Sequence, residues 1–270
     1  MTKSPTTIKQ SPLLVIVGET ASGKSALALG IAEELGGEIV CADSRTVYAG
    51  MDVGTAKPDK EDQERVRHHL LDVVKPDQSF TVVDFKKQAE AAIQDIITRG
   101  KLPILVGGSG LYIDAVIFDY RFPASASDRD SVNPRHLSGD VKATKSQIRQ
   151  NTLVVGMALS EETLQQRIED RVNTMFSAGL GEEVSRLGSK YTANTEPLKS
   201  IGYGEWHAYF EGRQTIEQTK EKIIVNTRKL AKKQRTWFKR NPDVQWFDDQ
   251  YLALEFVRNW HKTINRINKV

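Results

Sequence analysis

Short apolar runs alternate with stretches of helical apolar spacing through the first half of the chain. The runs predict buried strands at Leu13–Val17, Glu38–Ala42, Leu70–Val74 and Ile104–Val106. Between them, the spacing predicts helices at Lys24–Leu35 and Val82–Thr98, the second capped by Thr81 and ended by Gly100. This alternation favours a parallel sheet with helices on its faces.

The second half is richer in helical patterns. Leu153–Ala158 predicts another strand, most of the chain from Ser160 onward reads as helix, and Val244–Phe247 predicts a last short strand. The segment 121–151 is polar, contains Pro123 and Pro134, and has little periodicity, which predicts a surface excursion. We therefore expect one α/β domain over residues 1–270, with a helix-rich C-terminal part and a connector at 121–151.

Composition narrows the class of protein. The formal net charge is +3 and 27% of the residues are charged, so any signal for nucleic-acid binding has to be local. The single cysteine, Cys41, excludes an internal disulfide framework. No run reaches the roughly 18 apolar residues that span a bilayer, and 1–11 lacks the apolar middle of a signal peptide. We expect a soluble, cytoplasmic protein.

A phosphate-binding motif follows the first strand. The sequence GETASGKS at Gly18–Ser25 matches G-x-x-x-x-G-K-[ST] and leads into a predicted helix. Glycines let backbone N–H groups approach oxyanions, Lys24 supplies a positive charge, and Ser25 is a candidate Mg²⁺ ligand. The loop predicts that the protein binds a phosphate chain, with a sheet like that of P-loop NTPases. The motif does not identify the phosphate compound.

The second strand ends in a carboxylate, Asp43. In a nucleotide hydrolase, an acid at this position organises Mg²⁺. Because ligands bind beyond the carboxyl ends of parallel strands, Asp43 is equally a candidate general base facing the substrate. Spacing alone does not separate these two roles.

The residues after Asp43 resemble a known family. The run DSRTVYAGMDVGTAKP at Asp43–Pro58 resembles the signature of tRNA dimethylallyltransferases, the IPP transferase family. The resemblance continues in further blocks in the family's order, across nearly the whole chain: RHHLLDVVKP at Arg67–Pro76, DF at Asp84–Phe85, LPILVGGSGLY at Leu102–Tyr112, LQQRIEDRV at Leu164–Val172, IGYGE at Ile201–Glu205, and TRKLAKKQRTWFKR at Thr227–Arg240.

The resemblance implies transfer of a dimethylallyl group from dimethylallyl diphosphate to N6 of adenosine 37 in tRNA, with Mg²⁺. The leaving diphosphate needs stabilisation and the amine needs a base. By the match to the family, Asp43 is the base, and Thr20 and Arg171 contact the diphosphate. The residues we expect to bind the diphosphate are Gly18, Glu19, Thr20, Ala21, Ser22, Gly23, Lys24, Ser25 and Arg167, with Ser25 as metal ligand.

Arg167 and Arg171 stand four residues apart on a predicted helix that starts after Ser160. At about 100° per residue, both lie on one side and border the apolar stripe of Leu164, Ile168 and Met175. The helix can pack while its arginines reach a neighbouring site, where a forked guanidinium suits paired oxygens. The alternative is a pair of surface arginines bonded to nearby acids.

A basic helix near the C-terminus supplies a local nucleic-acid signal. Between Lys220 and Arg240 there are nine lysines and arginines and one acid, Glu221. Basic residues fall on one face and apolar residues on the opposite face, as expected for a helix that packs on one side and meets RNA phosphates on the other. A solvated helix face is the alternative. Together with family positions near the target nucleotide, the predicted tRNA contacts are Asp43, Ser44, Arg45, Thr46, Ser109, Lys199, Ser200, Ile201, Gly202, Tyr203, Gly204, Arg228, Lys232, Lys233, Gln234, Arg235, Trp237 and Lys239.

The chain departs from the family at 121–151. Bacterial members carry a longer helical insertion here that grips the anticodon stem-loop, and this chain has only a short segment. The shortening keeps open an adenylate isopentenyltransferase, which modifies a free nucleotide. A nucleotide kinase or NTPase would leave the blocks after residue 100 unexplained. A catalytically silent RNA-binding relative would not need Thr20, Lys24, Ser25, Asp43 and Arg171. The main expectation is a monomeric tRNA dimethylallyltransferase.

Overall fold

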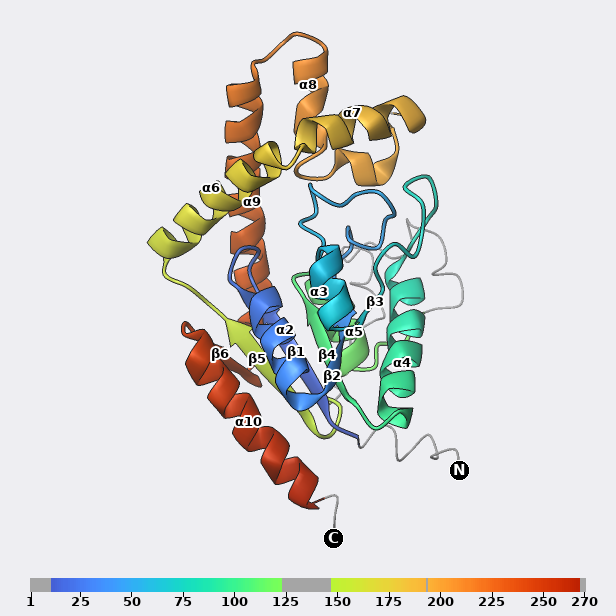
Figure 1. Cartoon of the computed structure of the whole chain (residues 1–270), viewed down its shortest axis with the longest axis vertical. Coiled ribbons are helices and arrows are strands. Elements are labelled where there is room, and N and C mark those ends of the chain that lie inside the picture. Colours follow the sequence, from blue (N-terminus) through green and yellow to red (C-terminus); the bar gives the residue numbers. More distant parts are fainter. Residues whose placement is uncertain (1–10, 123–146, 193, 268–270) are drawn as a thin grey trace.

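A parallel sheet forms the centre of the molecule, which a computed structural model describes for residues 11–122, 147–192 and 194–267 (Figure 1). Its strand order is β3-β2-β4-β1-β5-β6, and every neighbouring pair is parallel. The strands are β1 (Leu13–Gly18), β2 (Gly37–Cys41), β3 (His68–His69), β4 (Leu102–Gly107), β5 (Thr152–Met157) and β6 (Val244–Phe247).

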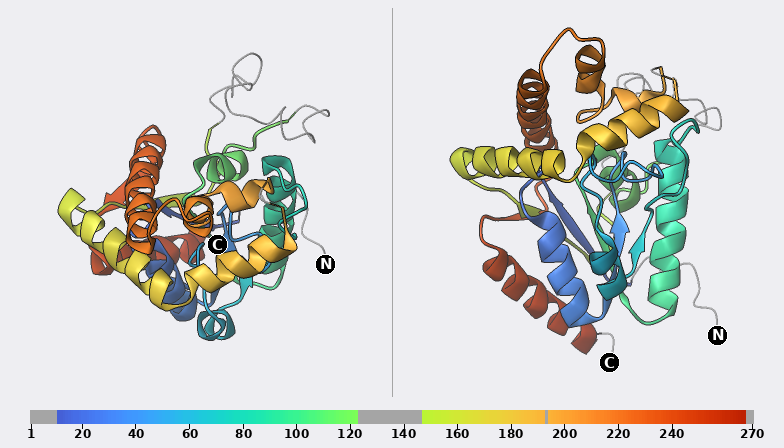
Figure 2. Two further views of the ribbon diagram at one scale, coloured as in Figure 1. Left: turned by 90° about the horizontal axis from the view of Figure 1, so that it is seen from above. Right: turned by 45° about the horizontal axis from the view of Figure 1, so that its top comes forward.

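Helices cover both faces of the sheet and extend beyond one end of it. Figure 1 shows α6, α7 and α8 past the end of the strands, and Figure 2 shows the same arrangement from above. The helices are α2 (Lys24–Leu35), α3 (Lys60–Arg65), α4 (Val82–Thr98), α5 (Gly110–Ile117), α6 (Glu161–Ser177), α7 (Leu180–Lys190), α8 (His207–Phe210), α9 (Ile216–Phe238) and α10 (Gln250–Ile267), with the 3₁₀ turns η2 (Glu196–Lys199) and η3 (Gly204–Trp206).

The alternation of side chains along β1 divides the core into two layers. Leu14 and Ile16 pack with residues of α2 and α10 on one face. Leu13, Val15 and Val17 pack on the other face with residues of α4, α5, α6 and α9. All six residues of β1 are buried because the strand lies inside the sheet with helices on both sides. The predicted α/β class, a P-loop-like parallel sheet with a helix-rich C-terminal part, is confirmed.

Helix ends follow the predicted capping signals. Thr81 and Asp84 form a reciprocal capping box at the start of α4, and Gly100 follows its end with φ of 74°. The side chain of Ser160 accepts the Thr163 N–H at the start of α6. These caps fix where the chain enters and leaves the helices beside the site.

The strand predicted at Leu70–Val74 is wrong. Pairing with β2 stops after His69, because Leu70 and Asp72 have positive φ angles of 66° and 53° that a strand cannot accommodate. Val74 instead makes an isolated parallel bridge with Tyr48. The segment therefore packs on the loop after β2, and most of the predicted connector at 121–151 lies outside the described residues. Within the described residues, no helix has the length and apolar character needed to cross a membrane.

Candidate active site

A cavity of about 450 Å³ opens at the carboxyl ends of the strands. Its walls come from six places: the phosphate loop, the loop after β2, the turn after β4, helix α6, the segment 199–202 and helix α9. The structure brings to this cavity, from segments far apart in the sequence, the predicted site residues Thr20, Lys24, Ser25, Asp43, Ser44, Arg45, Thr46, Ser109, Arg171, Lys199, Ser200, Ile201, Gly202 and Gln234.

The phosphate loop has the backbone of an anion cradle. Gly18 and Gly23 have φ angles of 147° and 91°, and Ala21 also has a positive φ of 63°. At Gly18, an added Cβ would lie 2.6 Å from the carbonyl oxygen of Met157, so only glycine fits this close approach. The helix that follows starts at Lys24 and adds positive potential at its N-terminus.

Lys24 and Arg171, both half-buried, share the cavity with one carboxylate, Asp43. Burial, reinforced by the nearby charge of Arg171, lowers the pKa of Lys24 to about 8, while Asp43 and Glu19 oppose the shift. Burial also lowers the pKa of Arg171, with Asp43 opposing. Arg171 donates to the carbonyl of Thr55 at 3.3 Å, and the Lys24 ammonium donates to the carbonyl of Glu19 at 3.0 Å. The excess of positive charge fits an anionic ligand.

Asp43 lies just after the end of β2, beside the turn that follows β4. Its Oδ1 accepts the N–H of Arg45 at 2.8 Å, and the N–H of Ser44 donates to Ser109 Oγ at 3.0 Å. A Cβ at Gly107 would lie 1.9 Å from the carbonyl oxygen of Ala42, so glycine is required for the two strand ends to approach. The backbone thus fixes Asp43 beside the turn that contains Ser109.

Cys41 also lines the cavity. Burial raises the pKa of its thiol to about 12. The thiol is therefore neutral at neutral pH.

Helix α9 is bonded directly to the phosphate loop. Gln234 Oε1 accepts the N–H of Thr20 at 2.8 Å, and its Nε2 donates to the carbonyl of Gly108 at 3.1 Å. Arg235 forms an ion pair with Glu19, whose side chain is 1% exposed. Both side chains were predicted from sequence to contact tRNA; in the structure they bond to the phosphate loop, and Gln234 also lines the cavity.

The other predicted residues of α9 have different surroundings. Arg228 pairs with Glu169 of α6. Trp237 donates to Asp114 at 2.9 Å, and the guanidinium of Arg240 lies 4.0 Å from the centre of its ring. Lys239 is exposed and lines neither the cavity nor the groove described next. The outer groove, an open hollow on the far side of α9, is lined by Lys229, Lys232, Lys233, Thr236, Trp237 and Arg240.

Several residues predicted to belong to the site do not line the cavity. Tyr203 is 1% exposed and donates to Glu183 at 2.7 Å, so its ring cannot stack on a base. Arg167 lies outside the cavity, with Nη1 3.1 Å from where a Cβ of Gly23 would be. The remaining predicted residues that do not line the cavity are Gly18, Glu19, Ala21, Ser22, Gly23 and Gly204.

Glu183 is the residue that sequence reasoning missed. It carries a carboxylate on the buried side of α7, between Leu180, Val184 and Leu187. An acid inside an apolar stripe was the available signal, because a buried charge requires partners. In the structure its partners belong to two segments of the cavity wall.

Comparison with known proteins agrees with this geometry. The family model described as IPP transferase matches residues 46–147 and 133–241. The tRNA dimethylallyltransferase of Pelotomaculum thermopropionicum is 36% identical, covering 93% of this chain and 96% of its own. That of Bacillus subtilis is 35% identical over 88% of this chain and 91% of its own. A tRNA isopentenylpyrophosphate transferase from Bacillus halodurans superposes with a TM-score of 0.82, at 31% identity, over 96% of this chain and 99% of that one.

The comparison also shows a difference in length. The alignment with the Pelotomaculum protein spans 303 positions, more than the 270 residues present here, so the relative contains residues that this chain lacks. The two family-model matches meet at 133–147, inside the connector predicted at 121–151. The chain belongs to the IPP transferase family.

Proposed function

We propose that this protein acts as a cytoplasmic monomer and transfers a dimethylallyl group from dimethylallyl diphosphate to N6 of adenosine 37 in tRNA. The observation that carries the proposal is the convergence of Lys24, Arg171 and Asp43 in one cavity at the end of the sheet. Two cations suit a diphosphate, and a single carboxylate beside them suits a base.

In this proposal the amine and the leaving group are handled by separate residues. The N6 lone pair forms a bond to the allylic carbon, and the carbon–oxygen bond breaks with its electron pair going to the diphosphate. Lys24, Arg171 and the loop amides stabilise the charge that develops on the diphosphate. Asp43 accepts the proton released from N6. Ser109, bonded to the Ser44 N–H, holds the turn beside Asp43.

The donor set fits Mg²⁺. Ser25 presents a hydroxyl to the cavity next to the phosphate loop. Among the described residues, no group of three or more His, Cys, Asp or Glu could hold a metal ion without other ligands. Mg²⁺ takes most of its ligands from phosphate and water, so one or two protein oxygens suffice. When bound, it would neutralise charge on the diphosphate.

The outer groove supports the RNA part of the proposal. Lys229, Lys232, Lys233 and Arg240 line one open surface together with Trp237. Clustered cations bind the phosphates of RNA without reading sequence. The groove lies on the same helix whose Gln234 reaches the cavity.

One assay tests the proposal against its alternatives. Mg²⁺, labelled dimethylallyl diphosphate and the protein are incubated with unmodified tRNA, AMP or ATP in separate reactions. We expect label in tRNA alone. Label in AMP and not in tRNA would identify an adenylate isopentenyltransferase, the alternative that the short connector keeps open. Phosphate release from ATP without prenylation would identify an NTPase, and binding of tRNA without transfer a silent relative.

A further inference from the structure

A buried carboxylate that forms no ion pair with any of the described residues stands outside the reaction described above. Glu183 of α7 is 6% exposed, and none of its hydrogen-bond partners is a lysine or arginine. A charge in this setting is stable only when several donors surround it. Glu183 has four such donors.

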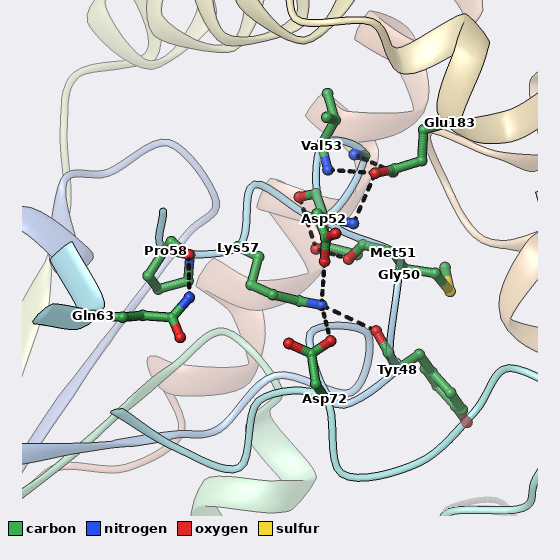
Figure 3. A network of polar contacts seen from close by, with 12 residues as sticks. Tyr48, Gly50, Met51, Asp52, Val53, Lys57, Pro58, Gln63, Asp72 and Glu183 are labelled. Atoms are coloured by element: carbon green, nitrogen blue, oxygen red, sulfur yellow. Dashed lines mark hydrogen bonds and ion pairs between the residues drawn. The ribbon is translucent and has the colours of Figure 1, made fainter. Parts of the chain in front are cut away.

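Three of these donors are consecutive backbone amides. Glu183 Oε2 accepts the N–H groups of Asp52 and Val53 at 3.0 and 2.9 Å, and Oε1 accepts that of Gly54 at 3.0 Å. Figure 3 shows the carboxylate directed at this bend of the loop after β2. The amides can all point to one place only while the loop keeps this bend.

The fourth donor comes from a different segment. The Tyr203 hydroxyl donates to Glu183 Oε1 at 2.7 Å. Burial and the adjacent carboxylate raise the pKa of Tyr203, so the hydroxyl keeps its proton. The ring of Tyr203 also lies 2.5 Å from where a Cβ of Gly54 would be, so the two segments are in direct contact.

Both segments continue into residues that line the cavity. We call these residues the outer wall; it consists of Gly54–Ala56, Pro58 and Lys199–Gly202. Within it, the carbonyl of Thr55 accepts the hydrogen bond of Arg171 at 3.3 Å. A second anchor, Lys57, pairs with Asp52 at 2.6 Å and Asp72 at 2.5 Å and is shown in Figure 3.

We propose that Glu183 is a positioning residue that holds the outer wall in register with the phosphate loop, so that Arg171 meets the leaving diphosphate at the right place. The functional half of this proposal rests on the proposed function. Glu183 does not touch the reacting atoms; it acts through Gly54, Thr55 and Arg171. A displacement of about 1 Å in such a shell costs on the order of 100-fold in rate.

The test compares Glu183→Gln with Glu182→Gln. Glu182 is the exposed neighbour in the same first turn of α7, so its variant removes the same charge without touching the outer wall. Glutamine at 183 keeps the volume but directs an N–H₂ group at donors that need an acceptor. Three measurements are made on the full chain: amide hydrogen exchange at 52–54, binding of inorganic pyrophosphate with Mg²⁺, and kcat and KM for transfer to tRNA.

We expect Glu183→Gln to speed exchange at 52–54 and to lower kcat at least about tenfold with a smaller change in KM. Pyrophosphate binding should change less than about threefold, because the phosphate loop is held separately by Gln234 and Arg235. Glu182→Gln should match the wild type throughout. Tyr203→Phe, which removes one donor and keeps the ring, should give an intermediate kcat.

Two results would overturn the inference. One is a normal kcat in Glu183→Gln although exchange at 52–54 is fast, which would show that the rate of transfer does not depend on how firmly the outer wall is held. The other is unchanged exchange at 52–54, which would show that Glu183 does not hold the wall. If the wild type transfers no dimethylallyl group to tRNA, the proposed function fails, and the exchange measurement still decides whether Glu183 holds the wall.

Discussion

Gln234 of α9 accepts the backbone N–H of Thr20 at 2.8 Å, so a helix more than two hundred residues away in sequence is bonded to the phosphate loop. The same side chain donates to the carbonyl of Gly108 at 3.1 Å, in the turn that also contains Ser109. One amide therefore joins the loop that we propose binds diphosphate to the turn that we propose contacts the nucleotide. If RNA binds on α9 as we propose, the helix that binds it is hydrogen-bonded to both the phosphate loop and this turn.

Gln234→Met removes both hydrogen bonds while nearly keeping the volume. We expect the free energy of unfolding to fall by about 1–3 kcal/mol, because Thr20 N–H and Gly108 C=O lose their partners. Pyrophosphate affinity should fall as well, since Thr20 loses its anchor. Denaturant titration and calorimetry measure the two effects. Normal stability and affinity would show that water replaces the amide fully.

Arg235 compensates a buried carboxylate in the phosphate loop. Glu19 is 1% exposed and Arg235 is its ion-pair partner, so Arg235→Ala leaves that charge unpaired. We expect a loss of about 3–5 kcal/mol in the free energy of unfolding, measured by denaturant titration. The double variant Glu19→Gln with Arg235→Met should recover part of the loss. A double variant less stable than Arg235→Ala would contradict this account.

The sequence predicted the fold well because its signals are local. Caps at Thr81 and Ser160 and alternating apolar runs depend only on neighbours within one turn or strand. The failure at Leu70–Val74 has a tertiary cause: the run is apolar because it packs on the loop after β2, and positive φ at Leu70 and Asp72 prevents pairing. An apolar run indicates burial and does not specify strand pairing.

The sequence identified the site residues that belong to motifs, but it did not identify the contacts that join distant segments. Lys24, Asp43 and Arg171 were placed in one cavity by their motifs, and the structure shows them there. Arg228 and Arg235 were assigned to RNA because a helical wheel shows which face is basic but not which acids oppose it. Helical spacing predicts which residues share a face, and the partners of that face come from distant segments.

The lowered pKa of Lys24 predicts opposite effects of pH on the free energy of unfolding and on pyrophosphate binding. Burial lowers this pKa to about 8 from the ordinary value of 10.5, so the folded protein binds fewer protons than the unfolded chain between these values. The free energy of unfolding should therefore rise with pH through this window. Pyrophosphate binding should weaken over the same window, because the loop loses a positive charge.

Lys24→Met is the control for both trends. It should bind pyrophosphate weakly at every pH and show no loss of affinity through pH 8. Calorimetry at a series of pH values measures the effect. An affinity that does not change between pH 7 and pH 10 in the wild type would exclude a lowered pKa at Lys24.

Asp43→Asn separates the base from a metal organiser. Asparagine keeps an oxygen that can accept the N–H of Arg45, now 2.8 Å from Asp43 Oδ1, so the loop should keep its shape. We expect transfer to fall by about 100- to 10,000-fold, because the amide cannot take the N6 proton. Pyrophosphate binding with Mg²⁺ should persist. If that binding collapses, Asp43 organises the metal.

The outer groove predicts how tRNA affinity depends on salt. Lys232 and Lys233 line the groove, whereas Arg228 pairs with Glu169. Each lysine that contacts an RNA phosphate releases counterions, so Lys232→Gln and Lys233→Gln should each reduce the slope of log affinity against log salt by about 1. Arg228→Gln should leave the slope unchanged, because its charge is already neutralised within the protein. Binding titrations at several salt concentrations measure these slopes. The reverse pattern, with only Arg228→Gln reducing the slope, would move the RNA from the outer groove to the junction of α6 and α9.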